Sequence, residues 1–219
     1  MDNPITDKES DFYNSVATNL TVGATGMQGW RLEMEDSHVA IDISDAPGHM
    51  FLAVFDGHAG AGAAKYAARE IIGHLKATEE WTRYISGNFS DPHLLGEAMA
   101  SAFVNLDQYM RAHQETTNGQ DSSGCTSVTA IVTPTHIICA NAGDSRCVMG
   151  TAGTTKELSF DHKPYNQTEK ERIEKAGGFV QWNRVDGDLA VSRALGDFGY
   201  KNATLEPKHQ KVQSLCSFA

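Results

Sequence analysis

Apolar and polar residues alternate along residues 37–43, and six apolar residues follow at 50–55, after a turn that contains Pro47 and Gly48. Period-two alternation and short apolar runs bounded by turn residues are typical of β-strands. These two segments therefore predict an antiparallel hairpin. From residue 59 to residue 76 the chain is rich in alanine, which favours a helix directly after the second strand.

A second helix is predicted where leucine, alanine and methionine recur every four residues from 94 to 110, because this spacing places them on one stripe. Strands are predicted on both sides of a turn at 133–135. Thr168 and Glu171 have the spacing of a capping box, which predicts a further helix that ends at Gly177. Strands and helices come in separate blocks joined by short turns. This order predicts an α+β fold in which helices cover antiparallel sheet.

Length and composition narrow the class of protein. A chain of 219 residues, 40% of them hydrophobic, predicts one compact domain. The net charge of −10 disfavours a nucleic-acid partner, because an acidic surface repels the phosphate backbone. The longest apolar run is far below the roughly 18 residues that span a membrane, and the polar N-terminus does not resemble a signal peptide. Four cysteines without paired spacing predict a reduced, intracellular protein, cytoplasmic or nuclear.

Carboxylates gather where strands are predicted to begin or end. Arg31, Glu35 and Asp36 precede the first strand, and Asp56 directly follows the apolar run at 50–55. Carboxylate oxygens are the ligands that Mg²⁺ and Mn²⁺ prefer, and a partly desolvated Asp56 would need a cation as its partner. Residues 29–36 also suit a solvated acidic loop in which Arg31 offsets the local charge.

Gly57, His58 and Asp144 are the remaining candidates. Gly57 permits close backbone approach, so its carbonyl can serve as a ligand. His58 titrates near neutral pH, which suits a proton donor to a leaving alcohol; the alternative is a residue that begins the next helix. Asp144 either caps a tight turn through backbone amides or adds a metal ligand, if that turn folds back beside Asp56.

Sequence motifs of other enzyme classes are absent. The chain has no Walker motif, no HExxH and no Gly-x-Ser-x-Gly, and Gly60 and Gly62 lack the third small residue of a dinucleotide fingerprint. A further acidic cluster at 184–197 is ambiguous by itself. Carboxylates at strand ends, together with one arginine, suit metal-activated water that attacks a phosphate ester.

Taken in order, six segments resemble the PPM, or type 2C, family of metal-dependent protein serine/threonine phosphatases. They are MQGWRLEMED (27–36), VFDGHAG (54–60), SGCTSVTAIV (123–132), ANAGDSRCV (140–148), LSFDHKP (158–164) and RVDGDLAVSRALGDFGYK (184–201). The resemblance covers roughly residues 21–212, after a polar arm at 1–20 and before a divergent tail at 213–219. It implies two antiparallel sheets packed as a sandwich and flanked by helices.

The resemblance also implies a site for two Mn²⁺ or Mg²⁺ ions. Asp56 would bridge the ions, Glu35 and the Gly57 carbonyl would serve one of them, and Asp36 would steady bound water. Asp144 matches a position associated with a further metal.

A phosphoprotein is the implied substrate. Arg31 would hold its phosphate, metal-activated water would attack phosphorus, and His58 would protonate the departing serine or threonine oxygen.

The sequence departs from the family pattern at its C-terminal end. Family domains continue past the segment that matches residues 184–201 through an Asp–Gly and then an Asp–Asn motif, each of which gives an aspartate to a metal, and residues 202–219 contain neither. Missing strands would leave sheet edges exposed, so we expect weakened metal binding and marginal stability or self-association. The alternatives to an active phosphatase are a pseudophosphatase that binds phosphoproteins without turnover and a chain shortened by a gene-model or splicing artefact.

Overall fold

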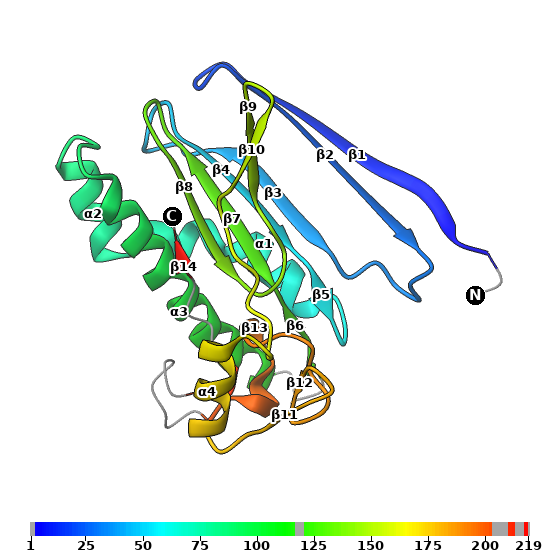
Figure 1. Cartoon of the computed structure of the whole chain (residues 1–219). Coiled ribbons are helices and arrows are strands. Elements are labelled where there is room, and N and C mark those ends of the chain that lie inside the picture. The colour runs from blue at the N-terminus through cyan, green and yellow to red at the C-terminus, as the bar shows by residue number, and fades with distance from the viewer. Residues whose placement is uncertain (1–2, 117–120, 203–209, 213–216, 219) are drawn as a thin grey trace.

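The computed structural model describes residues 3–116, 121–202, 210–212 and 217–218. Its centre is a five-stranded sheet in the order β14-β8-β7-β4-β3, with every neighbouring pair antiparallel (Figure 1). The strands are β3 (Ser37–Asp42), β4 (Met50–Phe55), β7 (Ser127–Val132), β8 (Ile137–Ala142) and β14 (Ser217–Phe218). The predicted hairpin of residues 37–43 and 50–55 is therefore confirmed as β3 and β4.

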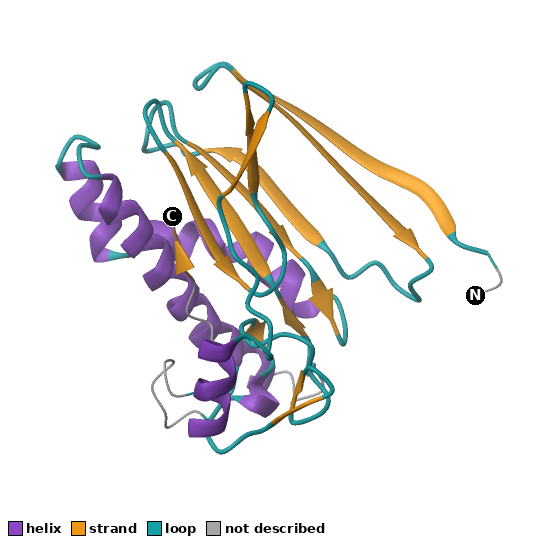
Figure 2. Cartoon of the chain, viewed as in Figure 1, coloured by secondary structure: helices purple, strands orange, loops and turns teal. Residues whose placement is uncertain are grey.

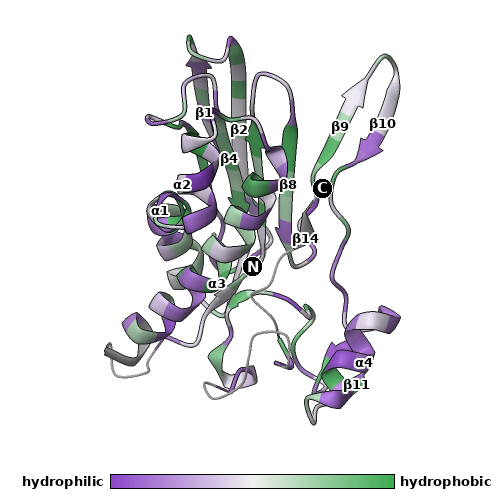
Figure 3. Cartoon of the chain, turned by 90° about the vertical axis from the view of Figure 1, so that its left-hand side faces the viewer, coloured by the Kyte–Doolittle hydropathy of each residue, from purple (hydrophilic) through white to green (hydrophobic). Residues whose placement is uncertain are grey.

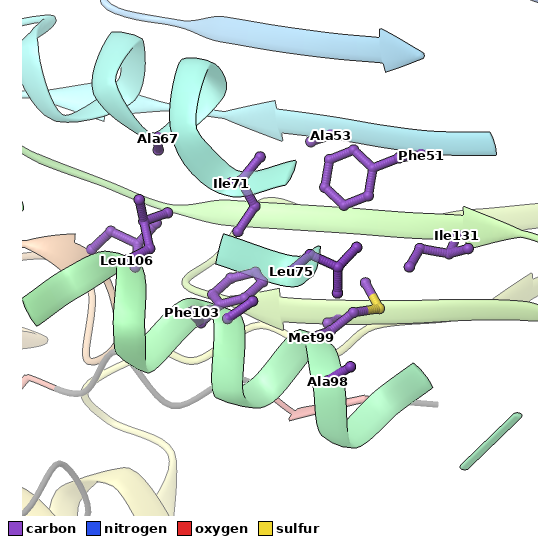
Figure 4. Packing of buried hydrophobic residues seen from close by; sticks show 14 of the residues in the cluster. Phe51, Ala53, Ala67, Ile71, Leu75, Ala98, Met99, Phe103, Leu106 and Ile131 are labelled. Carbon is purple, nitrogen blue, oxygen red and sulfur yellow. The ribbon is translucent and has the colours of Figure 1, made fainter. Parts of the chain in front are cut away.

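Three helices lie on one side of this sheet, where α1 and α3 pack on its strands and α2 packs on α3 and α1 (Figure 2). They are α1 (Gly62–Lys76), α2 (Glu79–Ser86) and α3 (Pro92–Thr116). The predicted stripe on α3 is confirmed, since Met99, Phe103 and Leu106 are fully buried in the same hydrophobic core as Phe51 of β4 (Figure 4). Burial of these side chains supplies most of the driving force for folding of this region.

Helix α1 begins three residues later than its alanine content predicts. Ala59 and Gly60 have φ values of 55° and 119°, which no α-helix accommodates. These residues instead turn the chain after the short strand β5 (Gly57–His58). The turn therefore separates the candidate residues at 56–58 from the helix.

The other face of the sheet is turned toward a long hairpin of β1 (Ile5–Ser15) and β2 (Leu20–Gly29). A cavity of about 460 Å³ lies between β2 and strands β3 and β4. A polar arm is expected at residues 1–20, and most side chains of β1 are polar and exposed, but the backbone of β1 is ordered by antiparallel pairing with β2. Tyr13 and Ser15 also donate hydrogen bonds to Asp42, at 2.9 and 2.6 Å.

The rest of the described chain consists of short elements. They are β6 (Gly124–Cys125), β9 (Val148–Thr151), β10 (Thr154–Glu157), α4 (Gln167–Lys175), β11 (Val180–Gln181), β12 (Arg184–Val185), β13 (Leu195–Gly196) and the 3₁₀ turn η1 (Phe198–Tyr200). Figure 3 shows that α4 is largely hydrophilic and lies apart from α1–α3. The predicted α+β fold with antiparallel sheets and helices is thus confirmed.

Helix α4 differs from its prediction at one end. The residue that precedes it is Asn166, which makes no side-chain capping bond, and Thr168 lies inside the helix, so the predicted capping box is wrong. Asn166 instead donates to the carbonyl of Asp161 at 2.8 Å. The predicted C-terminal end is confirmed, because Gly177 adopts a φ of 80° just after the helix.

None of the helices in the described ranges is long and apolar enough to cross a membrane. Most of the tail predicted to diverge, residues 213–216 and 219, lies outside the described residues, whereas Ser217–Phe218 form β14. The boundaries predicted for the arm, the domain and the tail stay predictions.

Candidate functional site

Asp56 occupies the point where the buried strand β4 leaves the sheet. Its main chain is fixed from both sides by Thr126, because the Thr126 amide donates to the Asp56 carbonyl at 2.9 Å and the Asp56 amide donates to Thr126 Oγ1 at 3.3 Å. A strand end held in this way gives the carboxylate a defined position.

The loop that carries Glu35 and Asp36 packs directly against this strand end. A Cβ atom on Gly57 would lie 2.3 Å from the Glu35 carbonyl oxygen, so a residue with a side chain does not fit there without a shift. The Glu35 side chain accepts a hydrogen bond from the Gly60 amide at 2.6 Å. Two segments that are 20 residues apart in the sequence are therefore locked together.

A cavity of about 210 Å³ opens between these segments. Five predicted site residues line it, and they are Arg31, Glu35, Asp36, Asp56 and Gly57. The other lining residues are Met27, Gln28, Glu33 and Met34. The volume is large enough for a phosphate group with several water molecules.

Asp56 carries a charge that the surrounding protein does not fully compensate. Burial raises the pKa of its carboxyl, and the negative charges of Asp36 and Asp144 raise that pKa further, against weaker opposition from His58 and Arg31. A bound cation would relieve this repulsion, because an opposite charge favours the ionised carboxylate. The carboxylate and carbonyl oxygens present also suit a hard divalent ion.

Two of the carboxylates near Asp56, Glu35 and Asp144, have other partners in this structure. Glu35 pairs with Arg31 at 3.2 Å, and Asp144 pairs with Lys163. Across the described residues, no group of three or more His, Cys, Asp or Glu side chains is arranged to hold a metal ion. The donor chemistry and the charge at Asp56 thus fit a divalent cation, whereas Glu35 and Asp144 would have to exchange partners to reach it.

Asp144 lies in the turn after β8, and that turn folds back toward Asp56. The Ser145 and Thr126 hydroxyls are 2.6 Å apart, so the residue that fixes Asp56 also contacts this turn. Gly143 has a φ of 115° and approaches Thr126 so closely that an added Cβ would lie 2.7 Å away. Thr126 is a positioning residue that the sequence analysis did not single out, since a threonine within an apolar strand segment gives no distinctive pattern.

Arg31 lies at the rim of the cavity with 71% of its side chain exposed. Its ion pair with Glu35 occupies one nitrogen, Nη2. A guanidinium presents five N–H donors in a planar fork that matches phosphate oxygens. Arg31 can therefore bind an incoming anion.

His58 does not begin a helix, contrary to one of the two interpretations of the sequence. It lies in β5, and its Nε2 is 2.9 Å from both carboxylate oxygens of Asp197. Burial lowers the pKa of His58, but the hydrogen bond and the charge of Asp197, together with Asp56 and Glu35, raise it, and the net direction is upward. Asp197 belongs to the acidic cluster at 184–197, where nothing in the pattern distinguishes it from the other acids.

Comparisons with known proteins point in one direction. A family model described as Protein phosphatase 2C matches residues 20–216. A probable protein phosphatase 2C of Caenorhabditis elegans is 40% identical over 213 residues, which are 97% of this chain and 56% of that protein. Protein phosphatase 1B of Rattus norvegicus is 40% identical over 209 residues, 92% of this chain and 52% of that protein. The chain thus spans about half the length of the curated relatives it matches.

Solved structures show the same fold. A serine-threonine phosphatase 2C from Toxoplasma gondii superposes with a TM-score of 0.73 at 22% identity, over 99% of this chain and 75% of that one. A C. elegans sex determining protein gives a TM-score of 0.69 at 23% identity, over 98% of this chain and 48% of that one. At these identities the likeness concerns the fold alone.

Proposed function

Because the chain belongs to the protein phosphatase 2C family, we propose that it hydrolyses phosphoserine and phosphothreonine in phosphoproteins and that the reaction depends on Mn²⁺ or Mg²⁺. The observation that carries this proposal is the cavity that joins Asp56, the Glu35–Asp36 loop and Arg31. Negative charge at its base and positive charge at its rim suit a metal ion and a phosphate group side by side.

Asp56 is the centre of the proposed metal site. Glu35, Asp36 and the Gly57 carbonyl would complete it from the loop and from β5, and Asp144 would serve a further ion. When bound, a divalent ion supplies a Lewis acid that activates water for attack on phosphorus. The raised pKa of Asp56 supports this role, because burial and then the negative charges of Asp36 and Asp144 make an unpaired carboxylate unfavourable there.

Arg31 and His58 would act on the substrate itself. Arg31 would hold the phosphate oxygens through its exposed guanidinium and keep phosphorus over the cavity. His58 would give a proton to the serine or threonine oxygen as the ester bond breaks, which removes the need to expel a strongly basic alkoxide.

A pseudophosphatase that only binds phosphoproteins is not supported by any of these observations. Self-association through sheet edges and an intracellular location stay predictions.

Hydrolysis of a phosphothreonine peptide by the purified chain in millimolar Mn²⁺ tests the proposal. We expect steady-state turnover that EDTA abolishes and that Asp56→Asn reduces by about 10³-fold, the scale expected for a residue of the reacting centre. Asp91→Asn is the matched control, because Asp91 accepts a hydrogen bond at the start of α3, where asparagine serves equally well. Absence of turnover in the unmodified chain, or full activity of Asp56→Asn, would contradict the proposal.

A further inference from the structure

His58 and Asp197 form a pair whose two members differ in exposure. Nε2 of His58 is 2.9 Å from each carboxylate oxygen of Asp197. The Asp197 side chain is only 4% exposed, whereas that of His58 is 25% exposed. The carboxylate is thus enclosed by protein, and the imidazole keeps an open side.

Three short strands bring this pair together from distant parts of the sequence. Strand β6 pairs with β5 on one side and with β13 on the other, so that His58 is opposite Gly124 and Gly124 is opposite Gly196. Each strand has only two residues, which is too little for a stable sheet by itself. Their pairing instead holds the backbone segments that carry His58 and Asp197 side by side.

The backbone at Asp197 is bent in a way that few residues adopt. Gly196 and Asp197 have φ values of 76° and 52°, so two consecutive residues are left-handed. Gly124 gives the carboxylate its space, because a Cβ there would lie 2.4 Å from Asp197 Oδ1. An unfavourable conformation held by neighbouring structure is typical of functional sites.

We propose that Asp197 is a positioning residue for His58. Asp197 fixes the imidazole ring by accepting a hydrogen bond from Nε2–H, and Nδ1 is then the ring atom that faces the substrate. This inference rests on the proposed function, in which His58 is the proton donor. A carboxylate that accepts one ring N–H sets both the orientation of the ring and the location of its second proton.

The proton inventory of the step balances. A water oxygen forms a bond to phosphorus, and the bond between phosphorus and the serine or threonine oxygen breaks. The proton on Nδ1 of His58 passes to that departing oxygen. The other proton stays on Nε2, which continues to donate its hydrogen bond to Asp197. The histidine is left as its neutral Nε2–H form and regains the Nδ1 proton from solvent, which also takes the proton lost by the attacking water.

The first test compares two substrates in the full chain. Asp197→Asn keeps the size of the side chain but weakens its hold on Nε2–H. We expect kcat for a phosphothreonine peptide to fall about 10- to 100-fold, whereas kcat for p-nitrophenyl phosphate, whose leaving group needs no proton, falls less than about threefold, with KM unchanged. In a His58→Gln background the same substitution should have no further effect. Equal losses of kcat on both substrates would overturn the proposal.

Asp107→Asn is the matched control for structural damage. Asp107 is also buried and accepts hydrogen bonds from the Gly196 amide at 2.9 Å and from Lys201 Nζ at 2.8 Å, so it supports the same strand β13 from another side. We expect this variant to lower stability and to change kcat for both substrates by one common factor. A preference for the aryl ester in Asp107→Asn as well would mean that the effect at Asp197 is structural.

The second test needs no catalysis. In the ¹⁵N spectrum of the histidine side chains, the signals of His58 are identified by their loss in His58→Gln. We expect the neutral ring to carry its proton on Nε2 in the unmodified chain. In Asp197→Asn we expect two neutral tautomers in exchange, one with the proton on Nε2 and one with the proton on Nδ1. A proton on Nδ1 in the unmodified chain would overturn the proposal, even if Asp197→Asn does not fold. If neither substrate is hydrolysed while the spectra behave as expected, the proposed function fails and the positioning of His58 stands.

Discussion

Two regions of this molecule are stabilised in different ways. The sheet region, defined as β3, β4, β7 and β8 with α1–α3, has a large core of buried apolar side chains. The α4 region, defined as residues 162–201, has a small apolar cluster and a buried carboxylate, Glu169, bound to Arg172, Arg193 and Ser192. Apolar burial depends little on pH or salt, whereas charge pairing depends on pH.

The candidate site joins these two regions. Asp56 and His58 follow a strand of the sheet region, but the partner of His58 is Asp197 of the α4 region. His162 also connects the α4 region to the turn after β8, because its amide donates to the Gly143 carbonyl at 2.9 Å. Conditions that loosen the α4 region should therefore disturb His58 before they disturb Asp56.

The largest loss of stability is expected from the core of the sheet region. Phe103→Ala removes a fully buried ring from α3 and should lower the free energy of unfolding by about 3–5 kcal/mol, through lost burial and a cavity. Urea denaturation at two salt concentrations measures this change in the free energy of unfolding, and the change should be the same at both concentrations. Tyr109→Ala on the exposed side of the same helix is the control, with an expected change within about 0.5 kcal/mol.

A comparable but pH-sensitive loss is expected in the α4 region. Burial raises the pKa of Glu169, but hydrogen bonds and charges from Arg193 and Arg172 lower it to about 2. Its stabilising contribution is present above the unfolded pKa near 4.5 and disappears as the pH falls toward 2. Glu169→Gln leaves two partly buried guanidinium groups without their counterion and should cost about 3–5 kcal/mol at pH 7.

Glu174→Gln is the matched control on the same helix. Glu174 pairs with Lys170 at 3.9 Å on the exposed surface, so its removal should cost less than about 0.5 kcal/mol. If urea denaturation gives equal losses for the two glutamate variants at pH 7, the distinction between the two regions is wrong.

A smaller effect concerns the contact between the regions. Burial and the charges of Arg193 and Arg172 lower the pKa of His162 to about 4, and its Nδ1 accepts a hydrogen bond from the Gly143 amide at 3.2 Å. The unfolded chain, with a histidine pKa near 6.5, binds the proton more readily, so stability should decrease by up to about 3 kcal/mol between pH 6.5 and pH 4 and no further below that. The free energy of unfolding, measured by urea denaturation at several pH values in this range, should change less with pH in His162→Gln than in the unmodified chain. An equal dependence on pH in the two proteins would contradict the expectation.

Prediction from the sequence succeeded where one local pattern decides the structure. The hairpin of β3 and β4 and the stripe on α3 follow from the periodicity of apolar residues. Strand β1 was missed because most of its side chains are polar and its order comes from backbone pairing with β2.

The site was predictable only in part, because only some of its residues are marked by a local sequence pattern. Asp56 follows an apolar strand, which is a local signal, and the proximity of Glu35 could be expected from the family resemblance. Thr126 and Asp197 were not identified, because their contacts with Asp56 and His58 span 70 and 139 residues of sequence. No single-sequence pattern encodes which of several acids in the cluster at 184–197 pairs with a histidine in β5.

The central claim is that Asp56 and the loop of Glu35 and Asp36 together hold a divalent cation. Calorimetric titration of Mn²⁺ into the purified chain, into Asp56→Asn and into the control Asp91→Asn tests it most directly. We predict binding to the unmodified chain and to Asp91→Asn, with loss of that binding in Asp56→Asn. Equal Mn²⁺ affinity in all three proteins would contradict the claim.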